Sequence, residues 1–126
     1  MNIPILVATG LMALTWIAHV FGGGPEINAP LQASDLPDYL RAMSGVLWHM
    51  ATTCLTVFFF ALAWLVRHPN AALTWVLSLV QLGWAGLFIY YGASQLGSLW
   101  PMPQWSVFLL IPALTLWGEW RRGSAT

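Results

Sequence analysis

Charged residues are scarce in this sequence, and lysine is absent altogether. Only 6% of the 126 residues are charged, whereas about a quarter are charged in an ordinary soluble domain. Four acids and four arginines cannot cover the surface of a soluble domain, so we expect lipid to be the solvent for most of it. The arginines form no basic tract and the formal net charge is zero, which excludes nucleic acid as an expected partner.

Several catalytic and cofactor signatures are also missing. Cys54 is the single cysteine, so neither an intrachain disulfide nor a cysteine metal cluster can form. The glycine run at 22–24 lacks the following Lys and Ser or Thr of a phosphate-binding loop, which argues against nucleotide binding. No serine-nucleophile motif is present. These absences favour a protein that is not an enzyme, and they leave the identity of any cofactor open.

The sequence is instead rich in long apolar segments, since 59% of its residues are hydrophobic. The first segment, 3–21, has about 19 residues, enough to cross a hydrocarbon core of roughly 30 Å as a helix, and the fourth, 105–120, is the shortest. We therefore predict an all-α fold, with residues 1–126 forming one domain that is a four-transmembrane-helix bundle with up-down topology. The predicted spans are 3–21, 40–66, 71–91 and 105–120.

Glycine and proline set the predicted boundaries of these spans. Three consecutive glycines are expected to end the first span and to open a loop over 22–37. Ser34, Asp35 and Pro37 resemble the start of the second helix. The residues 67–70 form a polar turn before the third span, and the prolines of 100–103 exclude a regular helix there. Pro112 should kink the fourth helix.

Arginine positions predict the orientation. With four spans, Arg67, Arg121 and Arg122 share one face, and the positive-inside rule makes that face cytoplasmic. Both termini are then cytoplasmic, and the loops that follow the first and third spans lie outside. We expect a multi-pass protein of a cell inner membrane, with the lipid bilayer as its main partner. A homo-oligomer or a larger membrane complex is compatible with the tryptophans and small-residue helix faces.

The polar side chains gather near the outer ends of the first two spans. His19 lies on the first span, Glu26 in the loop after it, and Arg41, His49 and Thr52 on one stripe of the second. Consecutive helices are usually neighbours, and polar groups in lipid face the bundle interior. These five residues are therefore predicted to form an outer-face polar cluster.

Three interpretations of this cluster remain open. His19, His49 and Glu26 offer nitrogen and carboxylate donors for a metal or haem redox site, although their spacing matches no metal signature. The same groups with Arg41 could handle protons or small solutes. In the third interpretation, a Glu26–Arg41 pair orders the first loop, the histidines bond to neighbouring groups, and the cluster binds a ligand or partner, as in an accessory subunit.

One resemblance adds to this picture. The pattern His19-x-x-Gly22-Gly23-x-x-Glu26, then Pro30-Leu31, Arg41 and Trp48-His49-x-x-Thr52, resembles one found in uncharacterised small four-helix integral membrane proteins of bacteria. It covers about the first half of the chain. The resemblance implies a fold and a membrane location, and it implies no reaction.

Overall fold

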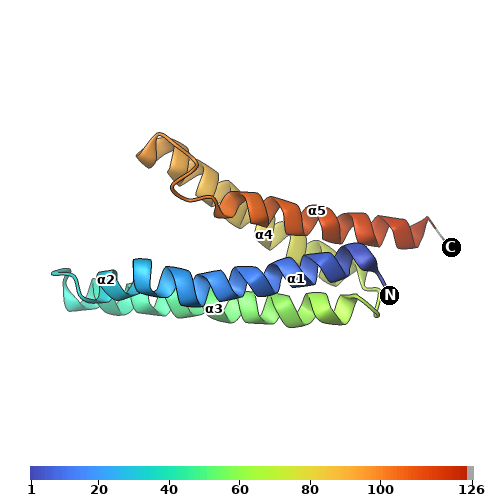
Figure 1. Ribbon diagram of the computed structural model, residues 1–126, viewed down its shortest axis with the longest axis horizontal. Helices are drawn as coiled ribbons and strands as arrows, with labels where there is room; N and C mark the ends of the chain where they lie inside the picture. Colours follow the sequence, from blue (N-terminus) through green and yellow to red (C-terminus); the bar gives the residue numbers. More distant parts are fainter. Residues whose placement is uncertain (125–126) are drawn as a thin grey trace. The chain divides into compact units, whose positions relative to one another are not determined.

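The computed structural model describes residues 1–124, and helices are the only regular secondary structure in that range. Five helices are α-helical and two stretches are π-helical, in which each turn is wider than in an α-helix (Figure 1). In chain order they are α1 (Ile3–Ile17), η1 (Ala18–Asn28), α2 (Ala29–Gln32), α3 (Asp38–Leu65), α4 (Ala71–Tyr91), η2 (Gly92–Leu96) and α5 (Gln104–Gly123).

The positions at which α3 and α4 begin are explained by the local sequence. Helix α3 begins at Asp38, directly after Pro37, as its capping residues predicted. Helix α4 begins after Pro69, and the Asn70 side chain accepts a hydrogen bond of 2.9 Å from the Leu73 amide, which caps the helix. The bounds of α4 are those predicted for the third span. The residues 97–103 are turns, as the prolines indicated.

The predicted loop over residues 22–37 is wrong for residues 22–32, and only residues 33–37 are non-helical. The chain continues from α1 through η1 and α2 as one helix of 30 residues, Ile3–Gln32. Glycine commonly ends a helix by turning the backbone left-handed, and no glycine of this run does so. Pro25 would clash with the carbonyl four residues earlier in an α-helix. The π-helical turn is wider, and the Ala29 amide bonds to the Gly24 carbonyl, five residues back.

Three helical stretches are long and apolar enough to cross a membrane. They are Ile3–Gln32, Asp38–Leu65 and Ala71–Leu96. Helix α5 has 20 residues, which is also enough length. Its C-terminal end, however, carries Glu119, Arg121 and Arg122, and these charges lower its hydropathy below that of the other three. Pro112 lies buried inside this helix.

The described chain forms two compact units. Unit 2 comprises Met12–Phe60 and pairs the end of α1, η1 and α2 with α3. Unit 1 comprises Met1–Leu11 and the residues from Ala61 onward, and its helices α4 and α5 lie side by side (Figure 1). Each unit keeps a small apolar core, with Met12, Leu55 and Phe58 in unit 2 and Ile5, Leu62 and Ile111 among those in unit 1.

Unit 1 gathers three chain segments at one end. The Asn2 amide donates to the Val66 carbonyl at 3.0 Å, and the Asn2 side chain donates to the Gly118 carbonyl at 2.7 Å. A Cβ at position 118 would lie 2.6 Å from Asn2 Oδ1, so glycine allows this close approach. The start of α1, the end of α3 and the end of α5 therefore meet at the same end of unit 1.

Candidate functional site

Two hydrogen bonds of the same design join the helices of unit 2. Trp16 Nε1 donates to Thr56 Oγ1 at 2.9 Å, and the Thr56 hydroxyl donates to the Thr52 carbonyl at 2.8 Å. One turn further along, His19 Nε2 lies 2.9 Å from Thr52 Oγ1, and the Thr52 hydroxyl donates to the Trp48 carbonyl at 3.0 Å. Because that hydroxyl proton is already used, Thr52 accepts from His19. His19 therefore carries its proton on Nε2.

The Trp48 ring fills the space beside this pair. It stacks on the His19 imidazole with ring centres 4.0 Å apart and an interplanar angle of 16°. A Cβ on Gly23 would lie 2.8 Å from the tip of the same ring. Gly23 is four residues after His19, so both lie on one face of the first helix. We call Trp16, His19, Trp48, Thr52 and Thr56 the seam; it fixes how α1 and η1 pack on α3.

A glutamine side chain joins α2 to α3 near the connection between these two helices. Gln32, the last residue of α2, donates to the Arg41 carbonyl at 3.1 Å and to Ser44 Oγ at 3.0 Å. Gly45 lies against the Gln32 side chain, since a Cβ added to this glycine would be only 3.4 Å from Gln32 Nε2. The connection between α2 and α3 is therefore held from both sides by side-chain bonds.

The structure does not pair Glu26 with Arg41, so that expected contact is wrong. Arg41 forms an ion pair with Asp38, one turn earlier in α3, and donates to the Ser34 carbonyl at 3.3 Å. Because the first helix continues past the glycines, Glu26 lies on its exposed face and makes no hydrogen bond or ion pair within residues 1–124. Glu26 is therefore available to a group outside the chain.

His49 is exposed and has a free ring nitrogen. Its Nδ1 lies 2.8 Å from the Gly45 carbonyl, and a carbonyl only accepts, so Nδ1 carries the proton. Nε2 then presents a lone pair, as in many histidines that bind a metal or accept a hydrogen bond. Together with Asn28 and Gln32, His49 lines a shallow open groove. The Oδ1 atom of Asn28 is buried there and has no hydrogen-bond partner among the described residues.

The predicted cluster is thus divided rather than convergent. His19 and Thr52 are bonded to each other inside the seam, whereas Glu26 and His49 are exposed and Arg41 is paired with Asp38. Within the described chain, no three His, Cys, Asp or Glu side chains are placed to hold a metal ion. His19, His49 and Glu26 therefore do not form the proposed three-donor group.

Sequence reasoning missed the contributions of Trp16 and Gln32. Trp16 is apolar by most scales, yet its ring N–H repeats the role of His19 three residues later. The signal was present, because Thr52 and Thr56 are spaced by one turn on α3, and Trp16 and His19 offer two ring nitrogens at a similar spacing on the first helix. Gln32 was hidden because the sequence predicted a loop at that position.

Comparison with known proteins identified no relative of this chain. No protein-family model, curated protein or solved structure matches the chain.

Proposed function

We propose that this chain is a small multi-pass protein of a bacterial inner membrane that works as a non-enzymatic accessory subunit. In this proposal an outer polar cap, which we define as Glu26 and His49, binds a ligand or a partner protein. The observation that supports it is the division of the predicted cluster. The seam uses His19 and Thr52 to join two helices, while the Glu26 carboxylate and His49 Nε2 stay exposed without partners.

The surface of the second helix supports the same proposal. Only 17% of the most apolar stretch of α3 is buried. Leu47 and Met50, which flank His49, are 58% and 57% exposed. Lipid can cover such a surface, but lipid tails leave a carboxylate and an imidazole unpaired. A protein partner could cover the apolar face and bond to the cap at the same time.

The topology belongs to the proposal as well. We propose four spans in up-down order, with α5 kinked at Pro112 and both termini cytoplasmic. The meeting of the start of α1 with the ends of α3 and α5 supports this arrangement. If α4 crosses the bilayer away from that end, α5 has to cross back to reach it.

Site-specific photocrosslinking in native membranes tests the proposed partner. A photoreactive phenylalanine analogue replaces Met50 beside the cap, or Leu79 of α4, which is equally exposed at 59%. We expect one discrete protein adduct from position 50 and none from position 79. In a His49→Ala, Glu26→Gln background the adduct at position 50 should fall about tenfold, because charge-assisted hydrogen bonds contribute roughly 1.5–3 kcal/mol each.

Each other outcome points elsewhere. An adduct of twice 13.9 kDa would identify the partner as a second copy of this chain. Equal adducts from positions 50 and 79, or an adduct that survives loss of the cap, would contradict the proposal. A Soret band or a stoichiometric metal in the purified protein that His49→Ala removes would instead identify a redox protein, in which His49 Nε2 serves as a ligand.

A further inference from the structure

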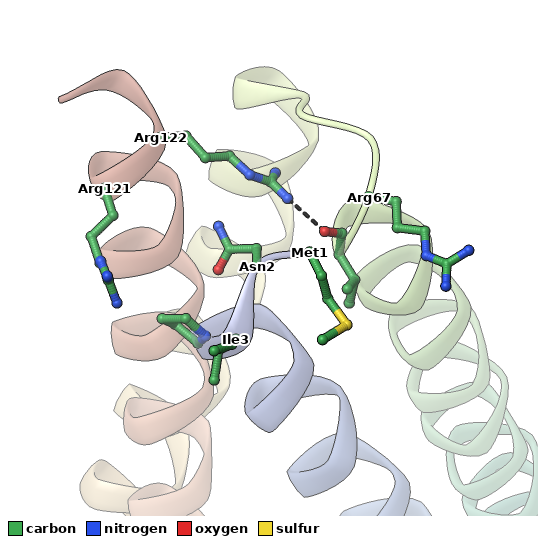
Figure 2. A pocket seen from close by; sticks show the side chains of 8 residues that line it. Met1, Asn2, Ile3, Arg67, Arg121 and Arg122 are labelled. Carbon is green, nitrogen blue, oxygen red and sulfur yellow. Dashed lines mark hydrogen bonds between the residues drawn. The ribbon is translucent and has the colours of Figure 1, made fainter. Parts of the chain in front are cut away.

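A second polar site lies at the end of unit 1 where three chain segments meet. An open pocket of about 350 Å³ is formed there by the start of the chain, the end of α3 and the end of α5. Its lining includes Met1, Asn2, Val66 and three of the four arginines, Arg67, Arg121 and Arg122. Figure 2 shows Arg67 and Arg121 on opposite sides of the pocket and Arg122 between them. Its volume is within the range of small-ligand pockets, roughly 300–1,000 Å³.

Arg122 has a structural task in this pocket. Its Nη2 atom donates to the Leu65 carbonyl at 2.7 Å and to the Val66 carbonyl at 2.8 Å. The dashed line in Figure 2 marks the second of these bonds. These carbonyls end α3 and carry the negative end of its dipole. Glu119 balances part of the remaining charge, with Oε2 at 3.7 Å from Arg122 Nη1. Arg122 therefore removes a negative field that would repel an anion from the pocket.

Arg67 and Arg121 are left without an acidic partner. Both are exposed, and neither forms an ion pair within residues 1–124. The Cζ atom of Arg121 lies 5.5 Å from the centre of the Trp117 ring, and such a cation–π contact does not use the hydrogen-bond donors of the guanidinium. No acidic side chain lines the pocket. The pocket is thus lined on opposite sides by two exposed arginines whose charge no acidic side chain of the lining compensates.

We infer that this pocket binds the phosphate of an anionic lipid headgroup, with the exposed side chains of Arg67 and Arg121 turning in to contact it. The guanidinium fork matches the oxygens of a phosphate better than it matches a spherical anion. The pocket also suits an amphiphile. Val66 and the side chains of Met1 and Ile3 make part of its wall apolar, and Trp117 and Trp120 are exposed on the adjoining end of α5. Exposed tryptophans are typical of the level of the lipid headgroups.

Native mass spectrometry of the full chain in a non-ionic detergent tests this inference. The probes are short-chain phosphatidylglycerol, short-chain phosphatidylcholine and inorganic phosphate at equal concentrations. We expect a single phosphatidylglycerol to stay bound, and the other two to bind at least tenfold more weakly. Arg67→Gln with Arg121→Gln should weaken phosphatidylglycerol binding about 30-fold, since each basic residue near an anionic headgroup contributes a roughly fivefold effect.

Arg41→Gln is the matched control, because it removes the same charge from the other unit and should leave phosphatidylglycerol binding unchanged. Arg67 and Arg121 are exposed, and circular dichroism of each single variant checks that the helices persist. Inorganic phosphate binding as tightly as phosphatidylglycerol would overturn the lipid headgroup as the ligand. Equal binding by the wild type and the double variant, or equal losses for Arg41→Gln, would overturn the site itself.

Discussion

At the scale of single residues, His19 makes two contacts that can be separated by substitution. The imidazole stacks on Trp48 and donates from Nε2 to Thr52. His19→Phe should keep the stacking and lose the donor, whereas Thr52→Val loses the acceptor. In a double-mutant cycle for unfolding in detergent we expect a coupling of about 0.6 kcal/mol, the average for such bonds between membrane helices.

Thr53 provides the control for that cycle. Its hydroxyl is exposed and bonds only to the His49 carbonyl of its own helix at 2.8 Å. Thr53→Val combined with His19→Phe should show no coupling. Additive effects of His19→Phe and Thr52→Val would mean that the bond contributes nothing to the seam and that His19 is held by stacking alone.

At the scale of elements, helix α4 has an unusual buried face. Thr74, Ser78 and Gln81 lie within one narrow stripe and are all 0% exposed. Thr74 Oγ1, Ser78 Oγ and Gln81 Oε1 have no hydrogen-bond partner among the described residues. A buried polar group without a partner costs roughly 1–3 kcal/mol. Thr74→Val, which keeps the shape, should therefore raise the free energy of unfolding by about 1 kcal/mol, measured by thermal or denaturant unfolding in detergent.

Thr115 on α5 offers a matched comparison. It is almost as buried, at 1% exposed, but its hydroxyl donates to the Ile111 carbonyl at 2.7 Å. Thr115→Val should not stabilise the protein, because it removes a satisfied bond. A lower stability of Thr74→Val, with Thr115→Val unchanged, would mean that the Thr74 hydroxyl forms a hydrogen bond with a bound group. The stripe on α4 would then be a candidate ligand site.

The elements also show where sequence reasoning succeeded and where it failed. The bounds of α4 followed from Pro69, Asn70 and an uninterrupted apolar run, since these signals are local. The stretch η1 could not be predicted, because glycines and Pro25 usually end a helix. Their effect here depends on the partner: a side chain at 23 would collide with the Trp48 ring, so the glycine serves packing between helices.

The candidate site was predictable to a similar degree. The periodicity of α3 placed Thr52 and Thr56 on the side of the partner helix, and both bond across to it. The predicted ion pair of Arg41 with Glu26 was wrong. Asp38 lies one turn away from Arg41 on the same helix, and the position of Glu26 depended on a stretch that was predicted to be a loop and is a helix. Local spacing was informative, and contacts that depended on a misread element were not.

At the scale of the whole molecule, the remaining question is whether α5 crosses the bilayer. Its 20 residues span about 30 Å, but its charged end makes it the least apolar of the four long helices. Within unit 1, Arg122 reaches the Leu65 carbonyl and Gly118 accepts from Asn2. The end of α5 is therefore beside the start of α1, so a four-span chain keeps Ser124 on the same side as the turn at His68.

Cysteine labelling tests this because Cys54 is the single native thiol. In a Cys54→Ala background, we introduce Trp100→Cys in the exposed turn before α5, His68→Cys in the turn after α3, or Ser124→Cys after α5. A membrane-impermeant maleimide should label position 100 in cells with a permeabilised outer membrane. On the proposed topology, positions 68 and 124 should react only after the inner membrane is opened, because the positive-inside rule predicts that the end carrying the arginines at 67, 121 and 122 is cytoplasmic. Labelling of position 124 from outside, with 68 protected, would show that α5 does not cross and that the chain has three spans.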